Sequence, residues 1–251
     1  MIATPVLTDA QVADFARDGY VVVPGAFGAA DAAVIERWAR EVEALPEAPG
    51  RHWVFHEKSR IDGRELINRI EYIAPFHDGF AALARTLEGP AAQLLGEAAV
   101  LFKEKINFKM PGGGGFDPHQ DAQAGWGDYA ANFINVMVCI DEATAENGCI
   151  ELAPGQHRRG LLRGMEPLTE EDTAEMKFVA WPTKPGDIAL FDAYVPHRSA
   201  PNPTATTRRM YFATYNRASE GDHLERYYAD KRKNYPPDIE REAGREYVYR
   251  V

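Results

Sequence analysis

The chain has 251 residues, of which 45% are hydrophobic and 26% are charged, and its formal net charge is −10. This composition is typical of a folded globular protein and excludes a disordered chain, while the negative charge argues against nucleic acid or an anionic membrane as a partner. The first residues show no basic leader followed by an apolar segment, and no apolar run approaches the ~20 residues of a membrane span, so we expect a cytoplasmic protein.

The first part of the chain predicts helices with a short strand between them. Thr8 is a suitable N-cap, and the apolar spacing that follows it predicts a helix that ends before a strand over 20–23. The spacing over 29–45 fits an amphipathic helix, and residues 77–97 also predict a helix.

Beyond residue 97 the pattern changes to short segments rich in β-branched and aromatic residues, separated by Gly, Pro, Asn and Asp. The expected strands lie within 101–110, 132–143, 148–154, 178–182, 187–192 and 208–217. They predict a mainly β fold with flanking α-helices, in which antiparallel strands form a sandwich or barrel. We expect a single domain over 1–251, with a helical N-terminal part (about 1–97), a β core (about 98–218) and a charged, irregular C-terminal segment on the surface (about 219–251).

The segment GGGGFDPHQD (112–121) carries the first candidate site. His119 and Asp121 are two residues apart, so on an extended strand both side chains point to the same face. Two histidines and one carboxylate are the ligand set of non-haem Fe(II) oxygenases. The glycines permit φ values that other residues resist and allow close approach of the backbone to a ligand. A phosphate-binding loop is disfavoured, because neither Gly-Lys-Ser/Thr nor a helix signal follows.

Such a metal site needs a second histidine from elsewhere in the chain. His197 follows the strand expected over 187–192 and precedes a turn, so it lies at a strand end where a barrel would place a ligand. We therefore favour His197. The competing histidines are His52, His56, His77, His157 and His223.

Arg208 lies eleven residues after His197 and begins a strand in which positions 208, 210 and 212 share a face. A guanidinium there is suited to bind a carboxylate through two hydrogen bonds, and Ser199 would add a hydroxyl donor. Arg209 is the alternative, because a shift of one residue in register would exchange the two faces. The spacing favours Arg208.

Together these motifs resemble those of the phytanoyl-CoA dioxygenase superfamily of Fe(II)/2-oxoglutarate-dependent oxygenases, which includes ectoine hydroxylase. The resemblance covers nearly the whole chain. Its segments are LTDAQVADFARDGYVVVPG (7–25), INFKMPGGGGFDPHQD (106–121), NGCIELAPGQH (147–157) and HRSAPNPTATTRR (197–209). The fold that it implies is a double-stranded β-helix, or jelly roll, of the cupin-like type.

The resemblance also implies the cofactors, which are Fe(II) and 2-oxoglutarate, with O2 as co-substrate. The implied iron ligands are His119, Asp121 and His197. The implied cofactor-binding residues are Lys105, Asn107, Phe116, Ser199 and Arg208, of which the last two would hold the far carboxylate of 2-oxoglutarate.

The strand expected over 101–110 is polar on one face and, except for Glu104, apolar on the other. By the resemblance the polar face lies inside the barrel, where a lysine is costly unless it meets an anion. We therefore interpret Lys103 and Lys105 as signs of a small anionic substrate, and Lys109 as part of a solvated face. Trp126 either lines the substrate pocket or packs beneath the loop.

The expected reaction is hydroxylation of a small metabolite, such as an amino acid derivative, a carboxylate or a phosphonate, with release of succinate and CO2. The retained Asp121 favours hydroxylation over halogenation, because related halogenases replace this carboxylate, whereas desaturation, epoxidation and ring formation stay open. One alternative is a cupin-like metal-binding protein or isomerase, which would not need Arg208 with Ser199. A zinc hydrolase is disfavoured, because no glutamate stands beside a ligand.

Overall fold

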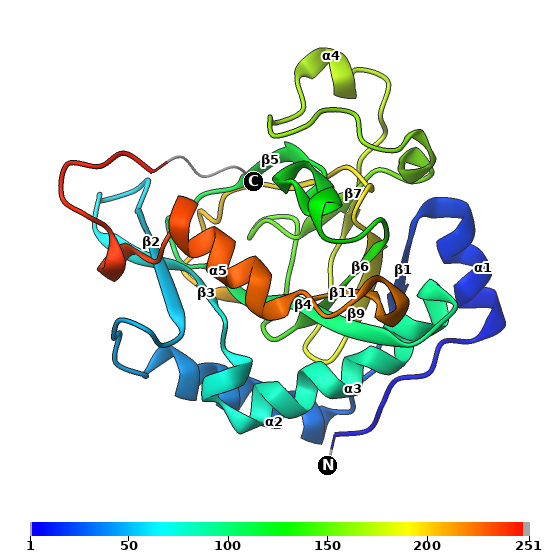
Figure 1. Cartoon of the computed structure of the whole chain (residues 1–251), viewed down its shortest axis with the longest axis horizontal. Coiled ribbons are helices and arrows are strands. Elements are labelled where there is room, and N and C mark those ends of the chain that lie inside the picture. The colour runs from blue at the N-terminus through cyan, green and yellow to red at the C-terminus, as the bar shows by residue number, and fades with distance from the viewer. Residues whose placement is uncertain (1, 248–251) are drawn as a thin grey trace.

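The structure is a computed structural model that describes residues 2–247, and it contains two antiparallel sheets (Figure 1). The seven-stranded sheet has the order β1-β9-β6-β11-β4-β3-β2, with β1 (Tyr20–Val23), β2 (Trp53–Lys58), β3 (Glu65–Glu71), β4 (Ala99–Lys109), β6 (Phe133–Cys139), β9 (Ile188–Asp192) and β11 (Arg208–Arg217). The four-stranded sheet has the order β5-β10-β7-β8, with β5 (Phe116–His119), β7 (Ile150–Leu152), β8 (Val179–Trp181) and β10 (His197–Ser199). The predicted fold class, mainly β with flanking helices, is confirmed.

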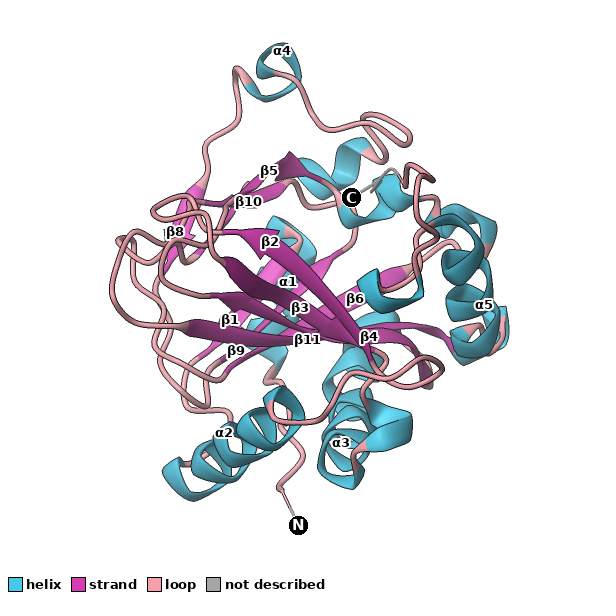
Figure 2. Ribbon diagram, turned by 90° about the vertical axis from the view of Figure 1, so that its left-hand side faces the viewer, coloured by secondary structure: helices cyan, strands magenta, loops and turns pink. Residues whose placement is uncertain are grey.

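Helices α2 (Ala29–Glu43) and α3 (Asp78–Leu95) cover one face of the large sheet, and the small sheet lies on its other side (Figure 2). The α-helices are α1 (Asp9–Asp18), α2 (Ala29–Glu43), α3 (Asp78–Leu95), α4 (Glu170–Thr173) and α5 (Leu224–Asn234). The 3₁₀ helices are η1 (Ala74–Phe76), η2 (Asp121–Ala124), η3 (Trp126–Asp128), η4 (Gln156–Arg159), η5 (Ala218–Glu220) and η6 (Asp238–Glu240). Within residues 2–247, no helix is long and apolar enough to span a membrane.

Local sequence explains where the first helix begins and ends. The Thr8 hydroxyl accepts a hydrogen bond from the Gln11 backbone N–H, and the Gln11 side chain accepts one from the Thr8 N–H, which forms a capping box. Gly19 ends the helix in a left-handed conformation, with φ 82°. The predicted helix start after Thr8 and the strand over 20–23 are confirmed.

The main core lies between the large sheet and the helices. The outward side chains of β4 and β11, including Ile106, Phe108 and Tyr211, are buried together with Leu83 and Leu87 of α3. Full burial of a large apolar side chain contributes about 1.5–3 kcal/mol. The tightly packed outer face therefore holds β4 and β11 in place, while Lys103, Lys105 and Asn107 of β4 lie on the inner face.

Two parts of the fold differ from the prediction. The N-terminal part is not only helical, because β2 and β3 join the edge of the large sheet beside β4. The C-terminal segment is not irregular, because it contains α5, whose Tyr227 and Tyr228 are buried and whose Lys231 forms an ion pair with Glu71 of β3. Charged residues interrupt the apolar pattern of both regions in the sequence, and they are buried here because they pair with each other.

Candidate active site

A cavity of about 200 Å³ lies between the two sheets, and its wall includes side chains of β4, β6 and β11 on one side and of β5 and β10 on the other. The predicted site residues that line it are Lys103, Lys105, Asn107, Phe116, His119, Asp121, His197, Ser199 and Arg208. Sites for drug-sized ligands usually measure ~300–1,000 Å³, so this cavity suits small molecules.

Trp126 does not line this cavity. Its ring is fully buried and packs against Phe102 and Phe133, with centroid distances of 5.5 and 5.3 Å. Of the two roles open for Trp126, the structure places it beneath the loop.

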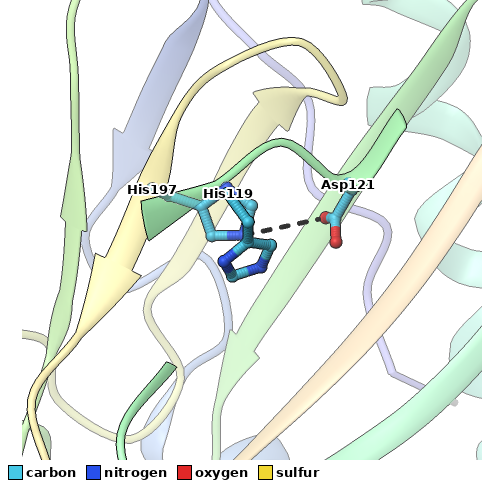
Figure 3. Close-up of side chains that lie close together, drawn as sticks. All are labelled: His119, Asp121 and His197. Carbon is cyan, nitrogen blue, oxygen red and sulfur yellow. Dashed lines mark ion pairs between the residues drawn. The ribbon is translucent and has the colours of Figure 1, made fainter. Parts of the chain in front are cut away.

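Three side chains meet at the candidate metal centre (Figure 3). His119 ends β5 and is the register partner of His197 at the start of β10, and Asp121 follows at the start of η2. Their potential ligand atoms all lie within 4.8 Å of one another, and His197 Nε2 is 3.8 Å from Asp121 Oδ2. One metal ion is therefore within reach of all three residues.

Hydrogen bonds set the tautomer of both histidines. Nδ1 of His119 lies 2.6 Å from the Asp117 carbonyl oxygen, and Nδ1 of His197 lies 3.0 Å from that of Val195. Since a carbonyl only accepts, each Nδ1 carries the hydrogen, and each Nε2 keeps a free lone pair for a metal.

The protonation states also suit a cation. Burial, with the neighbouring His197 adding to it, lowers the pKa of His119 to about 3. Burial by itself would raise the pKa of Asp121, but His197 and Lys103 lower it below its usual value. At neutral pH the site therefore offers a neutral His119 imidazole and a charged Asp121 carboxylate, which are the forms that bind metals.

Gln120, between the two ligands, is a structural residue that the sequence analysis did not identify. Its Nε2 donates to the carbonyl oxygens of Gly160 (2.9 Å) and Tyr194 (2.6 Å), and its Oε1 accepts from the Leu162 N–H (2.8 Å). The amide thus ties the metal-binding segment to two loops.

The glycine-rich segment allows β5 to approach β10. A Cβ atom at Gly115 would lie 2.6 Å from the Ser199 carbonyl oxygen, which no side chain tolerates. The close approach expected of the glycines is therefore made to the protein chain, and it brings His119 beside His197.

Arg208 and Arg209 point to opposite faces of β11. Arg208 is 4% exposed, lines the cavity, and has no hydrogen-bond partner for its Nε within residues 2–247. Burial lowers its pKa to about 10, which still leaves it charged at neutral pH. Arg209 instead binds Asp141 through Nε (2.7 Å) and Nη2 (2.9 Å) and Glu36 through Nη2 (2.8 Å). Only Arg208 is therefore placed to meet a ligand in the cavity.

Lys109 corrects the prediction of a solvated side chain. It is the register partner of Arg208, is only 1% exposed, and donates from Nζ to Ser199 Oγ (2.7 Å) and to the carbonyl oxygens of Gly148 and Ala200. A neighbouring loop and β10 cover the end of β4, which the alternation of the strand did not reveal. Because Lys109 donates to Ser199 Oγ, the Ser199 hydroxyl hydrogen is free to bind a ligand.

Lys103 and Lys105 lie on the inner face of β4, in the cavity wall. Lys103 is 8% exposed, and its Nζ lies 4.1 Å from the centroid of the Trp126 ring. Within residues 2–247 neither ammonium group makes a hydrogen bond or an ion pair. Burial, with Lys105 adding to it, lowers the pKa of Lys103. This end of the cavity therefore holds one buried and one half-buried lysine without a bonded anion in the described chain.

The chain is similar in sequence to two enzymes whose names refer to phosphonates. The chain is 40% identical to a methylphosphonate hydroxylase from Gimesia maris over an aligned region of 235 residues. This region covers 91% of this chain and 88% of that protein. It is 38% identical over 245 residues to a 2-aminoethylphosphonate dioxygenase from an uncultured bacterium, which covers 96% of this chain and 93% of that protein.

The fold is likewise similar to a solved structure. The crystal structure of EctD from S. alaskensis with 2-oxoglutarate and 5-hydroxyectoine matches with a TM-score of 0.74 at 28% identity, over 85% of this chain and 77% of that one. The predicted cupin-like jelly roll is thereby confirmed. The family model described as "Phytanoyl-CoA dioxygenase (PhyH)" matches residues 15–210 of this chain. This match and the two relatives show that the chain belongs to the phytanoyl-CoA dioxygenase family.

Proposed function

We propose that this dioxygenase uses Fe(II), 2-oxoglutarate and O2 to hydroxylate a small phosphonate. The observation that carries the proposal is one cavity that holds the His119, Asp121 and His197 cluster together with Arg208 and two lysines that form no ion pair within residues 2–247. The names of two relatives, which refer to methylphosphonate and 2-aminoethylphosphonate, support the substrate class. We also propose a cytoplasmic location, since 2-oxoglutarate is an intracellular metabolite.

The three clustered side chains fit an iron ion. Two imidazole Nε2 atoms and one carboxylate form the facial donor set that non-haem iron(II) oxygenases use, and the remaining coordination positions stay open for ligands. With 2-oxoglutarate and O2, the bound iron supplies the oxidising chemistry: one oxygen atom enters the substrate C–H bond, the other enters succinate, and CO2 leaves.

The proposed 2-oxoglutarate site lies at the Arg208 end of the cavity. The Arg208 guanidinium and the Ser199 hydroxyl would donate to the far carboxylate, and the Nε of Arg208, which has no hydrogen-bond partner among residues 2–247, can take part. Asn107 has a buried Oδ1 without a partner in the described chain, and we assign it, with Phe116, to the same pocket, whereas Lys105, between Asn107 and Lys103 on β4, faces the substrate.

The proposed substrate site lies at the Lys103 end. Lys103 and Lys105 form no ion pair in the described part of the chain, and this favours an anionic substrate, because a buried ammonium is costly unless an anion compensates it. A cavity of about 200 Å³ favours a small phosphonate over an acyl-CoA.

Anaerobic titration with Fe(II) and 2-oxoglutarate tests the cofactor site. We expect the weak visible charge-transfer band of the iron–2-oxoglutarate complex in the wild type, its loss in Asp121→Ala and its weakening in Arg208→Ala. Addition of methylphosphonate and O2 should then release succinate and a hydroxylated phosphonate in equal amounts. Iron binding without the band would favour the cupin-like protein that does not use 2-oxoglutarate.

A further inference from the structure

A buried amide faces the same end of the cavity as the two lysines. Asn135 of β6 and Thr214 of β11 are each 2% exposed, and both line the cavity. The Thr214 hydroxyl donates to Asn135 Oδ1 at 2.7 Å. Asn135 Nδ2 is buried and has no hydrogen-bond partner in the described part of the chain. Thr214 thus holds the amide with its acceptor occupied and its donor free.

Sheet register places this amide in line with Lys103. Thr214 is the register partner of Lys103 on one side and of Asn135 on the other, so the three residues form one row across β4, β11 and β6. Because β11 lies between β4 and β6, the backbones of Lys103 and Asn135 are two strand spacings apart, about 10 Å, a span that a lysine side chain and a small ligand above the row can bridge. Lys105 lies two residues along β4 and lines the same cavity.

All the free polar groups of this row are donors. Lysine ammonium groups only donate, and the Asn135 carbonyl oxygen already accepts from Thr214. A phosphonate has three acceptor oxygens, whereas a carboxylate has two. When a bound ligand leaves a buried donor unpaired, the cost of removing that donor from water is not compensated, and binding is weaker. Unpaired buried polar groups of this kind are the strongest means of discrimination between similar ligands.

We propose that Lys103, Lys105 and Asn135 form a three-donor subsite for the phosphonate group, and that Thr214 makes it selective by holding the Asn135 amide with Nδ2 toward the ligand. This inference rests on the proposed function and extends it from a substrate class to the residues that select it. Asn135 and Thr214 are specificity-determining residues, and their expected effect is on phosphonate affinity rather than on the metal.

Calorimetric titration of the anaerobic protein, loaded with Fe(II) and 2-oxoglutarate, tests the subsite with methylphosphonate and acetate as probes. We expect the wild type to bind methylphosphonate more tightly than acetate. Asn135→Asp keeps the size of the side chain and its bond from Thr214, but it replaces the donor by an acceptor and adds a negative charge that repels the phosphonate. It should weaken methylphosphonate binding about 10- to 100-fold, the effect of losing a hydrogen bond to a charged group.

Thr214→Val removes only the hydroxyl that holds the amide. It should weaken methylphosphonate binding roughly 5- to 10-fold and reduce the preference over acetate, whereas Thr214→Ser, which keeps the hydroxyl, should stay within about twofold of the wild type. The charge-transfer band and the melting temperature, measured on every variant, show that the cofactor site and the fold are intact.

Two results would overturn the inference, and they are distinguishable. If the wild type forms the band but Asn135→Asp and Thr214→Val bind methylphosphonate as the wild type does, the subsite is wrong and the proposed function stands. If the wild type forms no band and binds no methylphosphonate, the proposed function fails and the subsite fails with it.

Discussion

Arg208 and Arg209 are neighbours in β11, yet they have opposite surroundings. Arg209 faces the helices, where Asp141 and Glu36 accept its hydrogen bonds, and the bond to Asp141 raises its pKa. Arg208 faces the cavity, where burial lowers its pKa and its Nε has no partner in the described chain. A buried cation with protein carboxylates around it is a structural element, whereas a buried cation without them is suited to bind an anionic ligand.

The same contrast appears among the lysines near the cavity. Lys231 of α5 pairs with Glu71, a buried carboxylate that Arg69 also binds at 2.7 Å. Lys103 is buried nearby without an ion pair among residues 2–247. By the same reasoning as for the two arginines, Lys231 stabilises the fold and Lys103 is suited to bind an anionic ligand.

The largest expected effect separates the two arginines. Arg208→Met should raise the KM for 2-oxoglutarate on the order of 100-fold, because it removes charge-assisted hydrogen bonds worth about 2–3 kcal/mol. Arg209→Met should leave that KM unchanged and lower the free energy of unfolding by about 1–3 kcal/mol, because it leaves Asp141 and Glu36 without their cation. Steady-state kinetics and urea unfolding measure the two quantities. An increase of KM in Arg209→Met alone would reverse the assignment.

The two lysines should differ in the same way for the substrate. Lys103→Met should raise the KM for the phosphonate about 10- to 100-fold and affect the KM for 2-oxoglutarate far less. Lys231→Met should act mainly on stability, with a loss of about 1–3 kcal/mol, since Glu71 would keep only Arg69. An unchanged phosphonate KM in Lys103→Met would contradict the proposed substrate site.

Lys109 combines both roles, because it is paired with neutral acceptors and supports the cavity residue Ser199. Ser199→Ala should weaken 2-oxoglutarate binding by about 1–1.5 kcal/mol, roughly tenfold, with little change in melting temperature. Lys109→Met should weaken it to a similar degree and also lower the melting temperature, because the carbonyl groups of Gly148 and Ala200 lose their donor. If Lys109→Met changed only the melting temperature, Lys109 would have no part in cofactor binding.

The last prediction extends the comparison to two buried acids. The cations beside Glu71 lower its pKa against the effect of burial, whereas burial raises the pKa of Glu104 to about 7 although the backbone N–H groups of Ala74 and Ile73 oppose it. The folded state therefore holds the Glu104 proton at a pH where the unfolded chain has lost it. The free energy of unfolding should therefore be higher at low pH, where Glu104 is protonated in both states. It should fall as the pH rises from about 4.5 to about 7.

The isosteric variant Glu104→Gln isolates this group. Urea unfolding between pH 4.5 and 7 should show a stability decrease of about 1–3 kcal/mol in the wild type relative to Glu104→Gln. Parallel pH profiles of the two proteins would show that Glu104 does not titrate in this range.

Sequence by itself determined the parts of this protein that depend on local pattern. The alternation over 208–217 predicts β11 with its observed bounds, and Thr8 with Gln11 explains the start of α1. The spacing of His119 and Asp121, and the place of His197 at a strand end, identified the cluster that the structure assembles. These features could be predicted because strand alternation and helix capping involve residues close together in the chain.

Only the tertiary structure decided which buried charges have partners. Lys109 looked solvated, but Ser199 and Ala200, which receive its hydrogen bonds, lie 90 and 91 residues away in the chain. The partners of Lys231 and Asn135 are also distant in sequence, 160 and 79 residues away. Alternation tells on which face a side chain lies, but the free energy of a buried polar group depends on the group it meets there, and that neighbour is chosen by the packing of distant strands.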